Sequence, residues 1–261
     1  MRERLMLSAQ VIKKLFAGIA AGSMLLATAM PAAAEEMNSN EWEFGAEIYL
    51  WGAGIGTTTA EGDDIDISFS DLMKNLDMAL MTTLVARKDK WTLFSDIIYL
   101  DVSASDKSTA NIIGYPVKTK IDVGMEAWIV TTAGAYQVMQ NENTRLDVLA
   151  GARYFWLKMP MKIKIGERFS RKASPSGDVW DGVVGIRGNT SLNDKWYLTY
   201  YLDVGTGDTD LTWQAVAGFN YRFDKLDAAF GYRYLDWDFD DDAAFQDINV
   251  SGPYAGVRFR F

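Results

Sequence analysis

The strongest constraint in this sequence is an alternation of apolar and polar side chains with a period of two residues. Along residues 211–223 the odd positions hold Leu, Trp, Ala, Ala, Phe, Tyr and Phe, whereas the even positions hold Thr, Gln, Val, Gly, Asn and Arg. Residues 146–156 and 196–204 alternate in the same way. This period is typical of β-strands whose two faces meet different surroundings. The sequence therefore predicts an all-β fold.

A soluble β-sandwich also alternates, but three features favour a transmembrane antiparallel β-barrel. Segments such as 211–223 exceed the roughly 5 to 6 residues of a typical soluble strand. Their apolar faces begin and end with Trp or Tyr, as expected at the two borders of a membrane. Their polar faces carry charges at mid-strand, as at Arg153 and Asp203, which the dry core of a sandwich would not tolerate unpaired.

The spacing of the alternating segments predicts about ten strands. They are residues 42–54, 77–88, 90–104, 117–139, 144–160, 178–191, 195–206, 210–223, 226–238 and 249–261. Short turns alternate with longer connections between them, which places both ends of the barrel domain on one side and requires an even strand number. Eight or twelve strands remain alternatives, and residues 62–69 alternate well enough to form an additional hairpin arm.

The first 34 residues are predicted to be a cleaved signal peptide, which leaves residues 35–261 as a single barrel domain. Basic residues begin the segment, at Arg2, Arg4, Lys13 and Lys14. The apolar run over residues 15–30 is shorter than the roughly 20 residues of a membrane-spanning helix. The small residues Ala32, Ala33 and Ala34 follow it directly, as signal peptidase requires.

The composition excludes several classes of function. The chain has no Cys and no His, which removes disulfides, thiol nucleophiles, Ser-His pairs and most transition-metal sites. It has 35 acidic and 26 basic residues, and an acidic balance argues against a nucleic-acid partner. We therefore expect no enzymatic activity, no metal and no cofactor. An acidic run over residues 236–242 lacks the Gly and final Glu of a calcium loop.

The polar faces of the predicted strands carry acidic and basic side chains in similar numbers. These residues are Glu43, Glu47, Asp96, Glu126, Asp147, Arg153, Asp181, Arg187, Asp203, Arg222, Asp227, Arg233, Arg258 and Arg260. Mixed signs favour ion pairs across the lumen over a selectivity ring of one sign. Because about ten strands enclose little space, a polar plug or a very narrow pore is favoured over a wide channel.

The last strand carries the most specific motif. Tyr254 is followed by Gly256, and aromatic residues occupy the third-last and last positions, Phe259 and Phe261. This ending resembles the C-terminal assembly signal of bacterial outer-membrane β-barrel proteins. The likeness in architecture covers the whole barrel domain, whereas the motif covers only residues 254–261. Residues 49–51, 69–77 and 96–101 are also similar to small Gram-negative outer-membrane barrels.

The resemblance implies a location and partners but no activity. It implies export to the outer membrane of a Gram-negative cell, with periplasmic chaperones and the barrel-assembly machinery as partners during biogenesis. Contact with outer-membrane lipid and lipopolysaccharide follows. The enzymatic barrels of that membrane rely on His, which this chain lacks.

Two classes of function remain open. The first is a passive channel for ions or small solutes, or a structural barrel, with a narrow charge-lined lumen. The alternative is a surface-binding or adhesion barrel whose outer loops engage lipopolysaccharide or an external ligand.

Two features of the predicted loops bear on the choice between these functions, a short amphipathic helix and a basic arm. The helix has Ser70 as its N-cap, and its apolar face consists of Phe69, Leu72, Met73 and Leu76. The arm contains Lys162, Lys164, Arg168, Arg171 and Lys172. The helix would form a lid over the mouth or pack on the rim.

Overall fold

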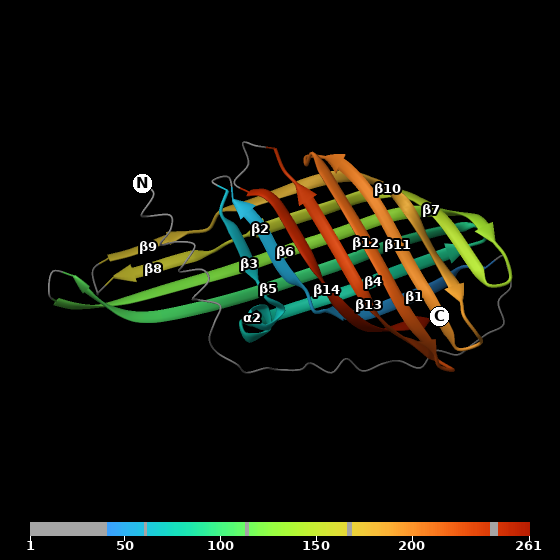
Figure 1. Ribbon diagram of the computed structural model, residues 1–261, viewed down its shortest axis with the longest axis horizontal. Helices are drawn as coiled ribbons and strands as arrows, with labels where there is room; N and C mark the ends of the chain where they lie inside the picture. The colour runs from blue at the N-terminus through green and yellow to red at the C-terminus, as the bar shows by residue number, and fades with distance from the viewer. Residues whose placement is uncertain (1–40, 60–61, 113–114, 166–168, 241–244) are drawn as a thin grey trace.

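The chain forms one closed antiparallel barrel of ten strands (Figure 1). The computed structural model describes residues 41–59, 62–112, 115–165, 169–240 and 245–261, so the predicted signal peptide lies outside the described residues. In ring order the barrel strands are β1 (Glu43–Trp51), β4 (Leu76–Lys88), β5 (Trp91–Ile112), β6 (Tyr115–Gln140), β7 (Thr144–Lys158), β10 (Ser176–Ser191), β11 (Trp196–Gly207), β12 (Leu211–Arg222), β13 (Leu226–Asp238) and β14 (Phe245–Arg260). Pairing of β14 with β1 closes the ring. The predicted fold class and the ten strands are confirmed.

Four short strands lie outside the ring, where the sequence predicted mostly loops. They are β2 (Gly54–Thr59), β3 (Asp64–Ile67), β8 (Met161–Ile165) and β9 (Phe169–Ala173). β2 and β3 form a hairpin, which agrees with the alternation noted over residues 62–69. β8 pairs with β6 and with β9. Together with the ends of the long β5 and β6, β8 and β9 form an arm that projects beyond the barrel in Figure 1. The sequence predicted loops over residues 105–116 and 161–177, and that prediction is wrong.

The N-cap of the short helix α2 (Phe69–Lys74) lies two residues before the predicted one. Ser68, not Ser70, is the N-cap, because the Ser68 hydroxyl accepts a hydrogen bond from the Asp71 N–H at 3.2 Å. Leu72 is buried against Val102 of β5, as expected for a helix that packs on the rim. Within the described ranges no helix is long and apolar enough to cross a membrane.

The outer face of the barrel is apolar and is bordered by two levels of paired aromatic rings. Near the short turns, Trp91 contacts Tyr136 and Trp196 contacts Tyr221, each with ring centroids 4.9 Å apart. Near the long connections, the pairs are Tyr99–Trp128, Tyr154–Trp180 and Trp213–Tyr234. Exposed aliphatic side chains lie between the two levels, among them Leu84, Val148, Val184 and Leu202. This arrangement matches the apolar band and aromatic girdles of a membrane barrel.

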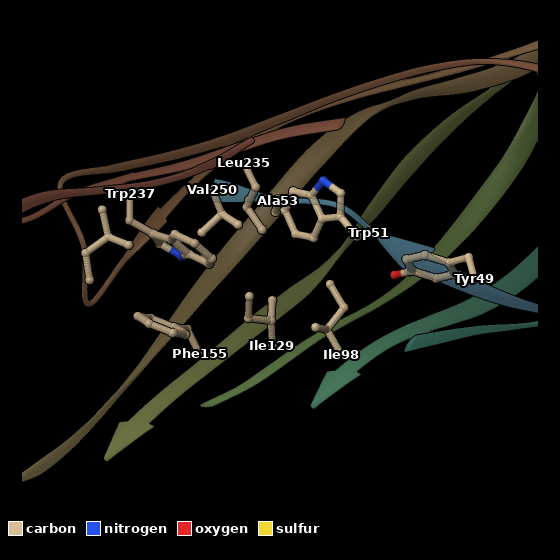
Figure 2. Close-up of a cluster of buried hydrophobic side chains, with 10 residues drawn as sticks. Tyr49, Trp51, Ala53, Ile98, Ile129, Phe155, Leu235, Trp237 and Val250 are labelled. Atoms are coloured by element: carbon tan, nitrogen blue, oxygen red, sulfur yellow. The ribbon is translucent and has the colours of Figure 1, made fainter. Parts of the chain in front are cut away.

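The interior is divided along the barrel axis. Toward the short turns it is lined mainly by charged and polar side chains, described below. Toward the long connections it is an apolar cluster in which Ile98, Ile129 and Phe155 face Trp51, Leu235, Trp237 and Val250 (Figure 2). Leu235 and Trp237 are fully buried. The sequence predicted a narrow, charge-lined lumen, and this apolar half is an addition to that prediction.

Candidate functional site

Arg233 crosses the lumen from β13 to β5. Its Nη2 lies 2.7 Å from Asp96 Oδ2, and its Nη1 donates to the Tyr49 hydroxyl at 2.8 Å. Nε and Nη2 donate to Gln214 Oε1 at 3.0 and 2.6 Å. The guanidinium also lies over the Trp51 ring, 4.7 Å from its centroid. Because β13 and β5 lie on nearly opposite sides of the ring, this side chain closes much of the cross-section.

Arg153 forms a second bridge beside the first. It is fully buried on β7, and its Nη2 pairs with Asp203 Oδ2 of β11. Nη1 donates to Thr212 at 2.8 Å and Nε to Thr131 at 3.2 Å. The Tyr201 hydroxyl donates to the same Asp203 carboxylate oxygen. All three guanidinium nitrogens have partners, as a buried charge requires.

A third network lies nearer the short turns. Arg258 donates to Glu47 Oε2 from Nε at 3.0 Å and from Nη2 at 2.6 Å. Its Nη1 donates to the Tyr197 hydroxyl, which in turn donates to Asp227. Arg260 pairs with the other oxygen of Asp227 at 2.8 Å. The last strand is thus tied to β1, β11 and β13 through charged side chains.

The remaining inward charges have separate local partners. Asp147 pairs with Arg145 at 2.7 Å, and Glu43 lies 3.7 Å from Arg87 at the rim. Asp181 accepts from the backbone N–H and the hydroxyl of Thr209. Two arginines lie over aromatic rings. The Arg187 guanidinium is 4.7 Å from the centroid of the Phe94 ring, and the Arg222 guanidinium is 5.3 Å from that of the Tyr197 ring.

Glu126 does not face the lumen, and its predicted place in the charge network is wrong. The inward positions of β6 are odd-numbered, as the buried Ile129 and Thr131 show. Glu126 points outward and pairs with Lys158 at 3.1 Å. The Tyr99 hydroxyl donates to the Glu126 carboxylate at 3.5 Å. This pair stands at the level of the aromatic girdle near the long connections, where a border with water accommodates charge.

Sequence reasoning missed the neutral partners of the charges. Tyr49, Gln214, Thr131 and Thr212 complete the two arginine bridges. Tyr49, Gln214 and Thr212 share the face parity of charged residues on their own strands, which is the signal that would have found them. The inward, odd-numbered positions of β6 that include Thr131 carry no charge. Arg145 was also missed, although it shares a face with Asp147 two residues along β7.

Two cavities of similar size lie at different levels. The first, about 240 Å³, is lined mainly by polar side chains, including Glu47, Arg145, Arg187 and Arg258. The second, also about 240 Å³, is lined almost wholly by apolar side chains, including Trp51, Ile98 and Ile129. The layer formed by Arg153 and Arg233 with their partners stands between them.

A closed ring of long antiparallel strands, apolar outside and ion-paired inside, decides the fold class. The chain has the outer-membrane β-barrel fold. No protein-family model matches the sequence, and no curated protein matches it. Among solved structures, this barrel is similar to the outer-membrane protease OmpT of Escherichia coli, with 11% identity, 84% of this chain and 97% of that chain covered, and a TM-score of 0.46.

Two further solved structures are similar to this barrel. The translocator domain of the autotransporter NalP from Neisseria meningitidis is 16% identical, with coverage of 86% and 90% and a TM-score of 0.42. Ail, the attachment invasion locus protein of Yersinia pestis, in complex with the heparin analogue sucrose octasulfate, is 12% identical, with coverage of 85% and 99% and a TM-score of 0.35.

The residues of the expected assembly signal divide between the two faces of β14 in this barrel. Tyr254 faces the lumen in an edge-to-face contact with Tyr49, with ring centroids 6.3 Å apart. Phe259 and Phe261 share the outward parity, and Phe261 is largely exposed. The backbones of Phe261 and Phe44 exchange two hydrogen bonds of 2.8 and 3.2 Å, which complete the closure of the ring.

Proposed function

We propose that this protein is an integral outer-membrane barrel whose lumen is closed to ions and hydrophilic solutes. The observation that carries this proposal is the pair of arginine bridges, because Arg153 is fully buried and Arg233 is only 5% exposed. Side chains lining an open aqueous path would be exposed to water. Beyond the bridges, the buried Leu235 and Trp237 add an apolar layer that ions do not cross.

The apolar outer face and its aromatic borders support the membrane location. On this proposal, residues 1–34 direct export, and chaperones and the assembly machinery receive the chain, with Tyr254, Gly256, Phe259 and Phe261 as its signal. The short turns then lie on the periplasmic side and the arm lies outside. The absence of His and Cys supports a role without catalysis.

The membrane location makes a direct prediction. Expressed with its first 34 residues in a Gram-negative cell, the protein should fractionate with the outer membrane. Unheated samples should migrate differently from boiled samples on a denaturing gel, because a closed hydrogen-bonded barrel resists the detergent until it is heated. Recovery in the soluble periplasmic fraction, with no heat-dependent shift, would refute the proposal.

A second candidate function is the binding of lipid phosphates by the arm. Register places Lys120 opposite Lys164 and Asp122 opposite Lys162, which in turn lies opposite Lys172. These cations share one face of the arm, and among the described residues of that face the carboxylate is that of Asp122, at 2.7 Å from Lys120. Phosphate groups of lipopolysaccharide are the anions that this face would meet in an outer membrane.

Charge reversal tests the arm. Replacing Lys162, Lys164 and Lys172 by Glu should weaken binding to lipopolysaccharide-containing vesicles by more than about a hundredfold, since each Lys near an anionic surface contributes about 1 kcal/mol and each new Glu is repelled by it. The measurement is co-sedimentation of the folded, detergent-solubilised protein at low salt. The matched control replaces Lys88, Lys90 and Lys195 by Glu. These three residues lie at the short-turn end, so this variant should bind the vesicles as the unaltered protein does. Equal losses in both triple variants would refute a specific role for the arm.

A further inference from the structure

The barrel wall is interrupted between β1 and β4. The two strands pair only as far as Ile48 and Thr82, although β4 continues to Leu76 and β1 to Trp51. At the end of this ladder the Trp51 backbone N–H donates to the thioether sulfur of Met81 at 3.1 Å, in place of a carbonyl oxygen. This interruption, bounded by residues 49–51 and 76–81, is called the seam.

The apolar cavity of about 240 Å³ lies behind the seam and reaches through it. Its walls include Ile98, Ile129 and Phe155, which face the lumen in Figure 2. They also include Leu50, which is exposed on the outward face of β1, and the exposed Met73 of α2. One continuous apolar cavity therefore connects the lumen with the outer face.

The seam opens among the side chains of the apolar belt. Ile48 and Leu50 of β1 and Met78 and Leu80 of β4 are all exposed outward, Leu50 by 67%. Leu80 is opposite Tyr99, which belongs to the aromatic girdle nearer the long connections. On the proposed orientation, the seam thus meets the outer leaflet close to the border between headgroups and acyl chains.

We propose that the cavity binds a hydrocarbon chain of an outer-leaflet lipid, which enters from the membrane through the seam. This inference rests on the proposed membrane location. The charged layer of Arg233 and Asp96 separates the cavity from the periplasmic end, so a hydrocarbon has no apolar path from that side. The seam provides such a path.

The chemistry of the lining selects a hydrocarbon over water. An apolar cavity of about 150 Å³ lined by Leu, Ile and Phe stays dry and takes up benzene, and this cavity is larger. Met73, Met81, Met125 and Met159 are among its lining residues. Unbranched thioether side chains adapt to ligands of varied shape, which suits a flexible acyl chain.

Photocrosslinking tests the proposal. The protein is refolded into vesicles that contain a phospholipid with a diazirine near the end of one acyl chain, irradiated, and mapped by peptide mass spectrometry. Adducts on outward residues such as Trp128 report insertion in the membrane. Adducts on the lumen-facing Ile129 or Phe155 report a chain in the cavity, and we expect both sets.

A filling variant provides the matched comparison. Ala127→Phe places a ring in the cavity that Ala127 lines, and should abolish the inward adducts while leaving the outward ones. Val216→Phe places the same aromatic side chain in the polar cavity and should change neither set. Outward adducts without inward ones in the unaltered protein overturn this inference alone. Loss of the outward adducts as well overturns the membrane location. Inward adducts that persist in Ala127→Phe overturn the assigned cavity.

Discussion

Replacing Arg153 by Met is expected to lower the free energy of unfolding by about 3–5 kcal/mol. The substitution leaves the Asp203 carboxylate, which is fully buried, without its counter-charge. It also removes the donors to Thr131 and Thr212. Equilibrium urea unfolding in lipid vesicles, followed by Trp fluorescence, measures the loss.

Two companion variants locate the cause. Arg87→Met removes an arginine of the same type at the rim, where its side chain is 34% exposed and its partner Glu43 lies 3.7 Å away, and should cost about 1 kcal/mol or less. The double variant Arg153→Met, Asp203→Leu should recover most of the stability, because an apolar pair can replace a buried ion pair. A single Arg153→Met variant as stable as Arg87→Met would contradict the assigned role.

Gly151→Leu is expected to prevent the barrel from closing. Gly151 lies opposite Ala133, and a Cβ there would stand 2.5 Å from the Ala133 Cα and closer still to the Thr132 carbonyl oxygen. Because both atoms belong to backbone, the strands themselves must separate. We expect a loss above about 3 kcal/mol, at the upper end of overpacking penalties. Little of the refolded protein should then show the heat-dependent gel shift.

The control for this substitution lies on the adjacent strand. Gly134 follows Ala133 on β6, and a Cβ there meets nothing within 4 Å. Gly134→Leu faces the apolar belt and should refold with the yield of the unaltered protein. Similar yields for Gly151→Leu and Gly134→Leu would show that the approach of β6 and β7 is looser than described.

The ring of strands could be predicted because each strand separates lipid from lumen. Its residues therefore alternate between apolar side chains and mixed or polar ones. The arm could not, since β8 and β9 pair locally beyond the barrel and carry no long two-faced pattern. Their backbone groups are satisfied by neighbouring strands that the sequence does not identify.

Face parity predicted which charges turn inward, but it did not predict their partners. Arg233 meets Asp96 from nearly across the ring, and Arg153 meets Asp203 past the intervening β10. Such pairings depend on how far successive strands are staggered and on how long each side chain is. The prediction for Glu126 was wrong because the sequence of β6 is apolar on both faces near Trp128. The face on which Glu126 lies was therefore ambiguous.

The apolar half of the lumen was the feature that the sequence pattern indicated least clearly. Trp51 and Trp237 have the inward parity, but aromatic side chains in a barrel strand are also expected at the membrane borders. Only the tertiary structure shows that these two rings turn toward Phe155 and Ile129, and that the seam lies beside them.

The closed lumen is tested most directly by single-channel recording. The protein is refolded, its heat-dependent gel shift is verified, and it is inserted into planar bilayers at high salt. The bridges of Arg153 and Arg233, with the apolar layer beyond them, predict a silent membrane with no discrete conductance steps. Regular, reproducible openings of the unaltered protein would contradict the closed lumen and restore the channel as its function.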